Sequence, residues 1–128
     1  MTPEVIYEEK EFLVVNKPAG MLTHAISNPQ FSIPSKTLVD WLIEKYPEVK
    51  GVGDDPEERP GIVHRLDKET SGLMAVAKSQ LMFLWLKKQF QDRKVEKKYI
   101  ALAYGNISQN EGEITAPIGR LGVKQVAI

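Results

Sequence analysis

The sequence predicts an α+β fold in which a mixed, largely antiparallel sheet is flanked by helices. Short runs rich in β-branched and aromatic residues indicate strands, and two longer segments carry apolar residues at helical spacing. These elements alternate irregularly along the chain, which is typical of α+β folds and not of regularly wound parallel sheets. A chain of 128 residues has room for one core. We therefore expect residues 1–128 to form a single domain.

The first two strands should form a hairpin. The apolar runs Val5–Tyr7 and Phe12–Asn16 lie on either side of the polar turn Glu8–Lys10. The Lys-Pro-Ala-Gly stretch 17–20 should end the second strand, because proline cannot donate to a strand ladder and glycine readily adopts positive φ. The stretch 23–35 is rich in Ser, Pro, Asn and Gln without periodicity, which predicts a loop.

A first amphipathic helix is predicted over Lys36–Tyr46. Ser35 is a suitable N-cap residue, and Pro47 would stop the helix. The apolar residues of this segment recur at helical spacing: Leu38, Trp41, Leu42 and Tyr46. The Gly-, Pro- and acid-rich stretch 51–60 indicates a second loop, and the continuous apolar run Gly72–Ala77 indicates a buried strand.

A second helix should run from about Gln80 to Asp92, with Ser79 as its N-cap. Its apolar face is predicted to consist of Leu81, Met82, Trp85 and Leu86. Beyond this helix the β-rich runs predict three more strands. They are Lys97–Tyr104, Glu113–Pro117 and a strand that begins within Val123–Ile128.

The composition excludes several classes of protein. Hydrophobic residues make up 42% of the chain and charged residues 27%, which is an ordinary mixture for a globular protein. The absence of cysteine excludes a disulfide framework and a thiolate metal site, and it fits a cytoplasmic location. The N-terminus is acidic where a signal peptide would be basic, and no apolar run is long enough to cross a membrane.

The formal charge is unevenly distributed although it sums to zero. Residues 1–59 hold six Lys/Arg and eleven Asp/Glu, a net charge of −5, whereas residues 60–128 carry +5. A chain divided in this way can present one basic face to a nucleic acid. Ordinary surface variation would give the same asymmetry, so charge alone does not select a partner.

The densest polar cluster of the chain is His64–Gly72, between a Pro-Gly turn and the predicted strand Gly72–Ala77. Five of the six side chains from His64 to Glu69 are ionisable, and they cannot all be buried cheaply. We therefore expect this cluster at the end of the sheet, or on a loop held by the sheet, where functional side chains commonly lie.

Three other interpretations of this cluster remain open from the residues alone. A group of Asp, Arg and Lys is also typical of a solvated turn with ion pairs. A metal site built on His64 and Asp67 lacks ligands, since the only other histidine is His24. A phosphoryl-aspartate enzyme of the haloacid dehalogenase type would need a second acid two residues after Asp67, and Glu69 is a poor substitute.

Residues 61–79 (GIVHRLDKETSGLMAVAKS) resemble the signature of the RluA-type pseudouridine synthases. That signature reads His-Arg-Leu-Asp, two variable residues, Thr-Ser-Gly and then an apolar strand. Residues 6–24 resemble the family's opening strands, with Asn-Lys-Pro-Ala-Gly after an apolar run, and residues 97–105 resemble its Lys-x-Tyr-x-Ala strand. The three matches occur in the family's order and cover about a third of the chain.

The resemblance implies an enzyme that isomerises uridine to pseudouridine in structured ribosomal or transfer RNA, without a cofactor or metal. The glycosidic bond breaks, the uracil turns, and its C5 is joined to the ribose C1′. By the same resemblance Asp67 is the catalytic carboxylate, Tyr99 packs on the uracil, and Arg65 is a catalytic-site arginine at the target pocket. The residues implied to support the site are Leu66, Thr70, Ser71 and Gly72.

A carboxylate suits this reaction because breaking a glycosidic bond builds positive charge at C1′. Asp67 could act as a nucleophile or as an electrostatic stabiliser, and the sequence leaves both roles open. The nearby Arg65 and Lys68 are expected to favour its ionised form. Tyr99 also has a purely structural interpretation, because tyrosines in strands commonly pack in the core or against a neighbouring strand.

RNA, and not DNA, is the expected partner. The target base must leave the RNA stack, and this requires phosphate contacts from basic groups. Segment Lys87–Lys98 contains six basic and two acidic residues and is the candidate phosphate-binding surface. A solvated helix end is the alternative interpretation. The residues expected to contact RNA are His64, Lys68, Lys94, Lys97 and Lys98.

Members of the family continue beyond these motifs, with further strands and another basic active-site residue. The chain is therefore expected to be the N-terminal portion of a catalytic domain, truncated at its C-terminus. A sheet cut at Val123–Ile128 would expose an unpaired apolar edge, so self-association through that edge is expected. The alternative function is that of a non-catalytic RNA-binding or structural remnant of such an enzyme.

Overall fold

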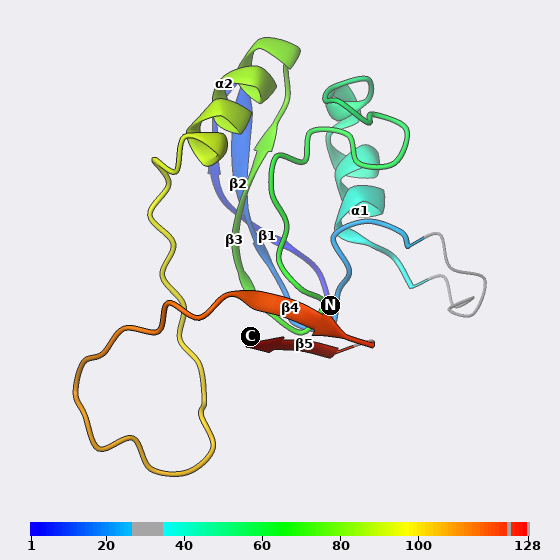
Figure 1. Cartoon of the computed structure of the whole chain (residues 1–128). Helices are drawn as coiled ribbons and strands as arrows, with labels where there is room; N and C mark the ends of the chain where they lie inside the picture. The colour runs from blue at the N-terminus through cyan, green and yellow to red at the C-terminus, as the bar shows by residue number, and fades with distance from the viewer. Residues whose placement is uncertain (27–34, 123, 128) are drawn as a thin grey trace. The chain divides into compact units, whose positions relative to one another are not determined.

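The computed structural model describes residues 1–26, 35–122 and 124–127. The chain divides into two units, Met1–Glu96 and Lys97–Ile128. The first contains a three-stranded sheet and two α-helices, and the second contains a two-stranded sheet (Figure 1). Both sheets are antiparallel, so the predicted α+β class with largely antiparallel pairing is confirmed. No helix of the described ranges is long and apolar enough to span a bilayer.

The sheet of the first unit has the order β1-β2-β3. β1 (Glu4–Glu8) and β2 (Phe12–Lys17) form the predicted hairpin, and β3 (Gly72–Ala77) pairs with the other edge of β2. The backbone N–H of Glu9 donates to the carbonyl oxygen of Phe12 (2.8 Å) and closes the hairpin turn. β2 is thus the central strand, and the start of β3 lies opposite its end.

Alternate residues of β2 face the core. Leu13, Val15 and Lys17 are buried, and the other three residues of the strand are half-buried. Val15 pairs with Met74 and Lys17 with Gly72 of β3. The period of two therefore places a lysine at the third core-facing position of an otherwise apolar row.

Helix α1 (Leu38–Lys45) begins two residues later than the predicted helix and ends one residue earlier, and its N-cap is Thr37 and not Ser35. The Thr37 Oγ1 accepts the backbone N–H of Asp40 (3.2 Å), and Asp40 Oδ2 accepts the backbone N–H of Thr37 (2.8 Å). This reciprocal capping box satisfies two N–H groups at the helix end, which a lone Ser35 cap would not do. A 3₁₀ turn, η1 (Pro47–Val49), follows the helix.

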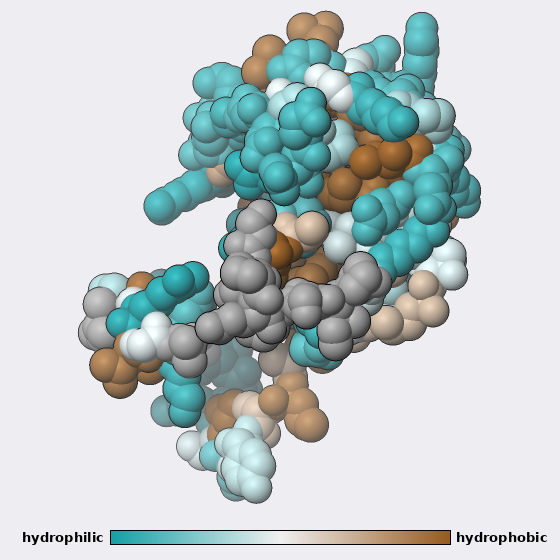
Figure 2. All heavy atoms as spheres, turned by 90° about the vertical axis from the view of Figure 1, so that its right-hand side faces the viewer, coloured by the Kyte–Doolittle hydropathy of each residue, from teal (hydrophilic) through white to brown (hydrophobic). Residues whose placement is uncertain are grey.

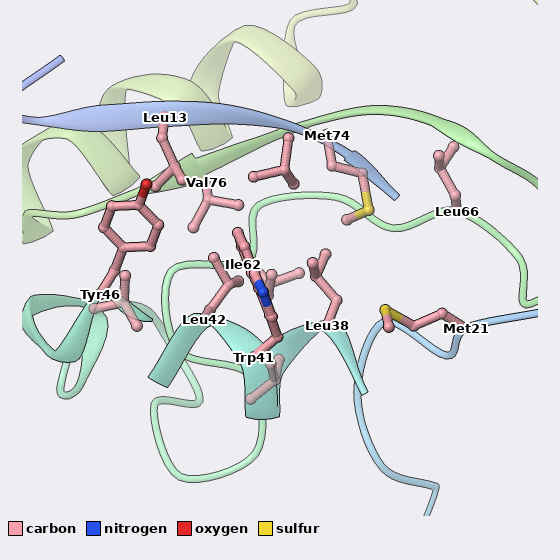
Figure 3. Packing of buried hydrophobic residues seen from close by; sticks show 13 residues of the cluster. Leu13, Met21, Leu38, Trp41, Leu42, Tyr46, Ile62, Leu66, Met74 and Val76 are labelled. Atoms are coloured by element: carbon pink, nitrogen blue, oxygen red, sulfur yellow. The ribbon is translucent and has the colours of Figure 1, made fainter. Parts of the chain in front are cut away.

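The main core lies between α1 and the inner face of the sheet. In Figure 3, side chains of α1 point toward those of β2 and β3, while Leu66 and Met21 lie at the end of the cluster near Met74. On the α1 side of this unit, hydrophilic residues cover most of the visible surface, and hydrophobic atoms gather in the gaps between them (Figure 2). α1 thus buries one face and exposes the other, as its amphipathic pattern predicts.

Helix α2 (Gln80–Gln91) begins at Ser79 as predicted, because the Ser79 hydroxyl accepts the N–H of Met82 (3.2 Å). The predicted apolar face is wrong in part. Phe83 is the buried residue, packed with Val52 and Ala77 and flanked by Met82 and Leu86. Leu81 and Trp85 are 80% and 57% exposed. Two apolar stripes share this helix at the same spacing, so periodicity alone could not select the buried one.

The second unit contains one hairpin, β4 (Ile118–Leu121) and β5 (Lys124–Ala127). β5 agrees with the strand predicted to begin within 123–128, although residues 123 and 128 lie outside the described ones. The predicted strands Lys97–Tyr104 and Glu113–Pro117 are wrong, since both stretches are irregular. β-rich composition does not suffice for a strand, which also needs a neighbour for its backbone groups, and neither described sheet includes these stretches.

Gly61 allows the segment before β3 to lie against that strand. Its φ is +72°, and a Cβ at this position would lie 2.5 Å from the carbonyl oxygen of Ala77. We expect Gly61→Ala to lower the free energy of unfolding by about 3 kcal/mol, through left-handed strain and a backbone clash. Urea unfolding measures this change.

Gly51→Ala is the matched control for Gly61→Ala. Gly51 has a φ of +80°, yet nothing lies within 4 Å of its added Cβ. The control should therefore cost only the strain of the left-handed conformation, about 1 kcal/mol. Equal losses in the two variants would contradict the clash at Ala77.

Candidate active site

Two loops meet at the end of the sheet where β2 stops and β3 begins. Residues 18–23 follow β2, and the polar cluster His64–Gly72 leads into β3. The backbone N–H of Gly20 donates to the carbonyl oxygen of Lys68 (2.8 Å), and Thr23 Oγ1 donates to that of Leu66 (3.2 Å). The polar cluster thus lies on a loop held at the end of the sheet, as its ionisable content predicted.

Asp67 lies on the outer side of this loop. Leu66 is buried in the core near Met74 (Figure 3), and the next residue exposes its carboxylate to solvent. The carbonyl oxygen of Asp67 accepts the N–H of Thr70 (3.0 Å) and closes a turn. An apolar anchor on one side and a closed turn on the other therefore present the Asp67 carboxylate outward.

Lys17 joins the two loops from inside the protein. Its side chain is 0% exposed, and its Nζ donates to the carbonyl oxygens of Pro18 (3.0 Å), Met21 (2.8 Å) and Lys68 (3.1 Å). Three carbonyl acceptors match the three donors of an ammonium group. This one side chain therefore fixes the loop after β2 to the turn that carries Asp67.

Two carboxylates of the candidate site act on the charge of Lys17. Burial lowers the pKa of Lys17 from its usual value, while the negative charges of Glu69 and Asp67 raise it. The two carboxylates therefore favour the charged form of the buried ammonium. Lys17 is not among the predicted site residues, although its place in the alternation of β2 was an available indication.

The motif cations lie differently from what the sequence suggested. Among the described residues, neither Arg65 nor Lys68 forms an ion pair with Asp67. Lys68 is exposed on the turn, and Arg65 lines a pocket whose described lining does not include Asp67. Lys17, and not these two residues, is thus the cation fixed at the turn.

His64 holds the motif against the open edge of β3. Its Nε2 accepts the backbone N–H of Ala75 (3.0 Å), so the ring takes the place of a partner strand's carbonyl. The ring also stacks on Phe90, with centroids 4.5 Å apart and planes at 22°. Beside it, Ile62 forms a bridge with Val76. The structure therefore gives His64 a packing role, and its contact with RNA stays a prediction.

The basic segment Lys87–Lys98 begins inside α2 and continues past its end. Lys87 pairs with Asp54, and Lys88 pairs with Asp92 at 3.2 Å. Arg93 and Lys94 are exposed just beyond the helix. The charges of Lys87 and Lys88 are therefore partly neutralised by ion pairs, and exposed basic side chains continue into the C-terminal part of the segment.

Three predicted functional residues belong to the second unit. Tyr99 is 63% exposed and lies in an irregular stretch. Lys97 and Lys98, which precede it, are exposed as well. Because Tyr99 is exposed, it does not pack in the core, which was the structural alternative for this residue. Its contact with the uracil stays a prediction.

A pocket of about 240 Å³ adjoins the motif in the first unit. His64 and Arg65 line it together with residues of the 51–60 loop and of α2: Asp54, Asp55, Arg59, Phe83 and Lys87. In the described part of the chain, no three His, Cys, Asp or Glu side chains are grouped so as to hold a metal ion. The pocket is thus lined by mixed charges over an apolar floor.

Comparison with known proteins shows which sequences the chain is similar to. Residues 11–127 match the RNA pseudouridylate synthase family. A protein from Aquifex aeolicus described as an uncharacterized RNA pseudouridine synthase is 42% identical over 91% of this chain and 35% of its own length. Ribosomal large subunit pseudouridine synthase D from Pseudomonas aeruginosa is 41% identical over 95% of this chain and 35% of its own length.

A solved structure is similar as well. Human RNA pseudouridylate synthase domain containing 4 is 27% identical, with a TM-score of 0.50 over 71% of this chain and 30% of that protein. The chain spans about a third of the length of the curated relatives it matches.

Proposed function

Because the chain belongs to the RNA pseudouridylate synthase family, we propose that it isomerises uridine to pseudouridine in ribosomal or transfer RNA, with Asp67 as the catalytic carboxylate. The observation that carries this proposal is the exposed carboxylate of Asp67, presented by a turn that the buried Lys17 fixes from below. A rigid support of this kind keeps a reacting group in place during catalysis.

In the proposed reaction, the Asp67 carboxylate faces the ribose C1′ of the target uridine as the glycosidic bond breaks. Positive charge develops at C1′, and an ionised carboxylate stabilises it through charge or through a covalent bond. Tyr99 and Arg65 complete the catalytic set. The uracil then turns and joins C1′ through C5, which releases any bond between C1′ and the carboxylate. C5 loses its proton and N1 gains one, so the isomerisation balances without a cofactor, and we place it in the cytoplasm.

RNA binding is proposed to use basic groups on both units. The residues assigned to it are His64, Lys68, Lys94, Lys97 and Lys98. Phosphate contacts of this kind supply most of the affinity and help to offset the cost of moving a base out of its stack. Self-association through the second unit belongs to the same proposal, since its β4–β5 hairpin leaves Ile118 and Leu121 exposed.

A second candidate function is RNA binding without catalysis. The observation that favours it is the group of exposed basic residues Arg93, Lys94, Lys97 and Lys98, since phosphate contacts do not require a catalytic carboxylate. The two candidates differ in one measurement, which is the conversion of uridine in unmodified ribosomal and transfer RNA by the 128-residue chain and by Asp67→Asn. Conversion that depends on Asp67 supports the enzyme, and RNA binding without conversion supports the second candidate.

The basic segment should contact phosphates. Replacing Lys94, Lys97 and Lys98 with glutamine should weaken RNA binding and flatten its dependence on salt, by up to about one unit of logarithmic slope per lost contact. Binding measured by fluorescence anisotropy at several salt concentrations tests this. As a control, glutamine at the exposed residues Lys10, Lys50 and Lys124 removes the same charge elsewhere. Equal slopes for the two triple variants would assign Lys87–Lys98 to ordinary solvated surface.

A further inference from the structure

The pocket beside the motif combines apolar and charged groups. Ile62, Val63 and Phe83 supply apolar surface, Arg59 and Arg65 supply guanidinium groups, and Asp55 supplies a half-buried carboxylate. The rest of the lining consists of two imidazoles and an ion pair: His24, His64, Asp54 and Lys87. All of these residues belong to the first unit. At about 240 Å³ the pocket is smaller than the roughly 300–1,000 Å³ of sites for drug-sized ligands. It suits a flat group the size of one nucleobase.

The charges of this pocket are only partly neutralised within the protein. Lys87 and Asp54 form an ion pair across its rim. In the described part of the chain, no ion pair involves Arg59, Arg65 or Asp55. The pocket thus offers two guanidinium groups and one carboxylate to a ligand, above an aromatic and aliphatic floor.

A nucleotide satisfies these groups together, which simpler ligands do not. Inorganic phosphate would pair with the arginines and leave the Asp55 carboxylate beside a second negative charge. A metal cation would suit the carboxylate and be repelled by the arginines. A nucleotide places its phosphate on a guanidinium, its base on the apolar floor and its N–H groups on the carboxylate.

The carboxylate selects among the bases by their hydrogen-bond donors. Guanine presents two adjacent donors, N1–H and the N2 amino group, which match the two oxygens of a carboxylate. Uracil presents one N–H between two carbonyl oxygens that a carboxylate repels, and adenine and cytosine present one amino group beside an acceptor nitrogen. We infer that this pocket binds a guanosine nucleotide of the RNA, with Asp55 as the residue that recognises the base. This inference rests on the proposed function, because it places the guanosine beside the target uridine.

Binding of free nucleotides to the whole chain tests this inference. We expect GMP to bind about tenfold more tightly than IMP, which lacks the N2 amino group and so loses one hydrogen bond to a charged acceptor. UMP and inorganic phosphate should bind more weakly than IMP. Amide chemical shifts in NMR titrations locate the site, and those of Asp55 and Val63 should move most.

Two variants assign the selectivity to Asp55. Asp55→Asn should abolish the preference for GMP over IMP. IMP keeps its N1–H and loses only the charge of its acceptor, so IMP binding within a few fold of the parent shows that the pocket is still formed. Glu57→Gln is the matched control, because Glu57 is exposed on the same loop and does not line the pocket. This control should keep the tenfold preference for GMP.

Three results would overturn the inference: no binding of GMP, equal affinities for GMP and IMP, or shifts confined to residues outside the pocket. Its failure is distinguishable from that of the proposed function. If the chain binds GMP selectively but Asp67→Asn leaves uridine conversion unchanged, the guanosine pocket is supported and Asp67 is not the catalytic residue. If conversion depends on Asp67 but the chain does not prefer GMP, the catalytic assignment is supported and the guanosine pocket is wrong.

Discussion

Replacing Asp67 with asparagine should lower the conversion of uridine by at least about a thousandfold. Asparagine has nearly the same size and keeps the exposed position on the turn, but it carries no charge and is a poor nucleophile. Either role proposed for the carboxylate at C1′ is therefore lost. Pseudouridine formed in unmodified ribosomal RNA, measured under single-turnover conditions, gives the size of the loss.

The matched control for this substitution is Glu69→Gln. Glu69 is an exposed carboxylate on the same turn, and it also interacts with the charge of Lys17. Loss of a charge next to Lys17 is thus common to both variants, and only Asp67 is assigned to the reaction. We expect conversion by Glu69→Gln to remain within a few fold of the parent. If Asp67→Asn converts uridine nearly as well as the parent, Asp67 is not the catalytic carboxylate.

The strands and helices of the first unit could be predicted because local patterns determine them. The apolar runs around Glu8–Lys10 give the β1–β2 hairpin, and the run Gly72–Ala77 gives β3 with the predicted bounds. Errors arose where two local patterns competed. Thr37 and Ser35 are both good caps, and α2 carries two apolar stripes, so only tertiary packing decides between them.

The second unit shows where local prediction fails. The stretch Lys97–Tyr104 has the composition of a strand and yet is irregular. Strand formation depends on a partner that supplies hydrogen bonds along the backbone, and composition does not reveal whether one is present. β4 and β5, in contrast, are joined by a short turn at Gly122, so each strand finds its partner within a few residues.

The motif of the candidate site could be predicted from the sequence, but the hydrogen bonds that hold its loop in place could not. The ionisable residues around Asp67 indicated a loop at the end of the sheet. The contacts that hold this loop come from Lys17 and Thr23, more than forty residues away in the sequence. Every residue has a backbone carbonyl, so the residue type of the acceptor does not indicate which side chain will donate to it. The motif alone therefore does not reveal Lys17 or Thr23 as donors.

Replacing Lys17 with methionine should lower the free energy of unfolding by about 2 kcal/mol. Methionine fills a similar volume but donates no hydrogen bond, so the carbonyl groups of Pro18, Met21 and Lys68 lose their shared donor. The carbonyl oxygen of Lys68 keeps the N–H of Gly20 as a donor. Leaving the acceptors of Pro18 and Met21 without a partner costs about 1–3 kcal/mol each when they are buried. Part of this cost is offset, because the variant no longer buries an ammonium group. Urea unfolding at neutral pH measures the net change.

Lys68→Met separates the buried hydrogen bonds from the loss of charge. Lys68 lies next to Asp67, but its side chain is exposed, so the substitution removes the same charge without removing a buried donor. Its effect on unfolding should stay within about 0.5 kcal/mol. Equal stability of the two variants would mean that water replaces the Lys17 contacts without loss. A loss confined to Lys17→Met, together with faster hydrogen exchange at Gly20 and Thr70, would show that this buried lysine orders both loops of the site.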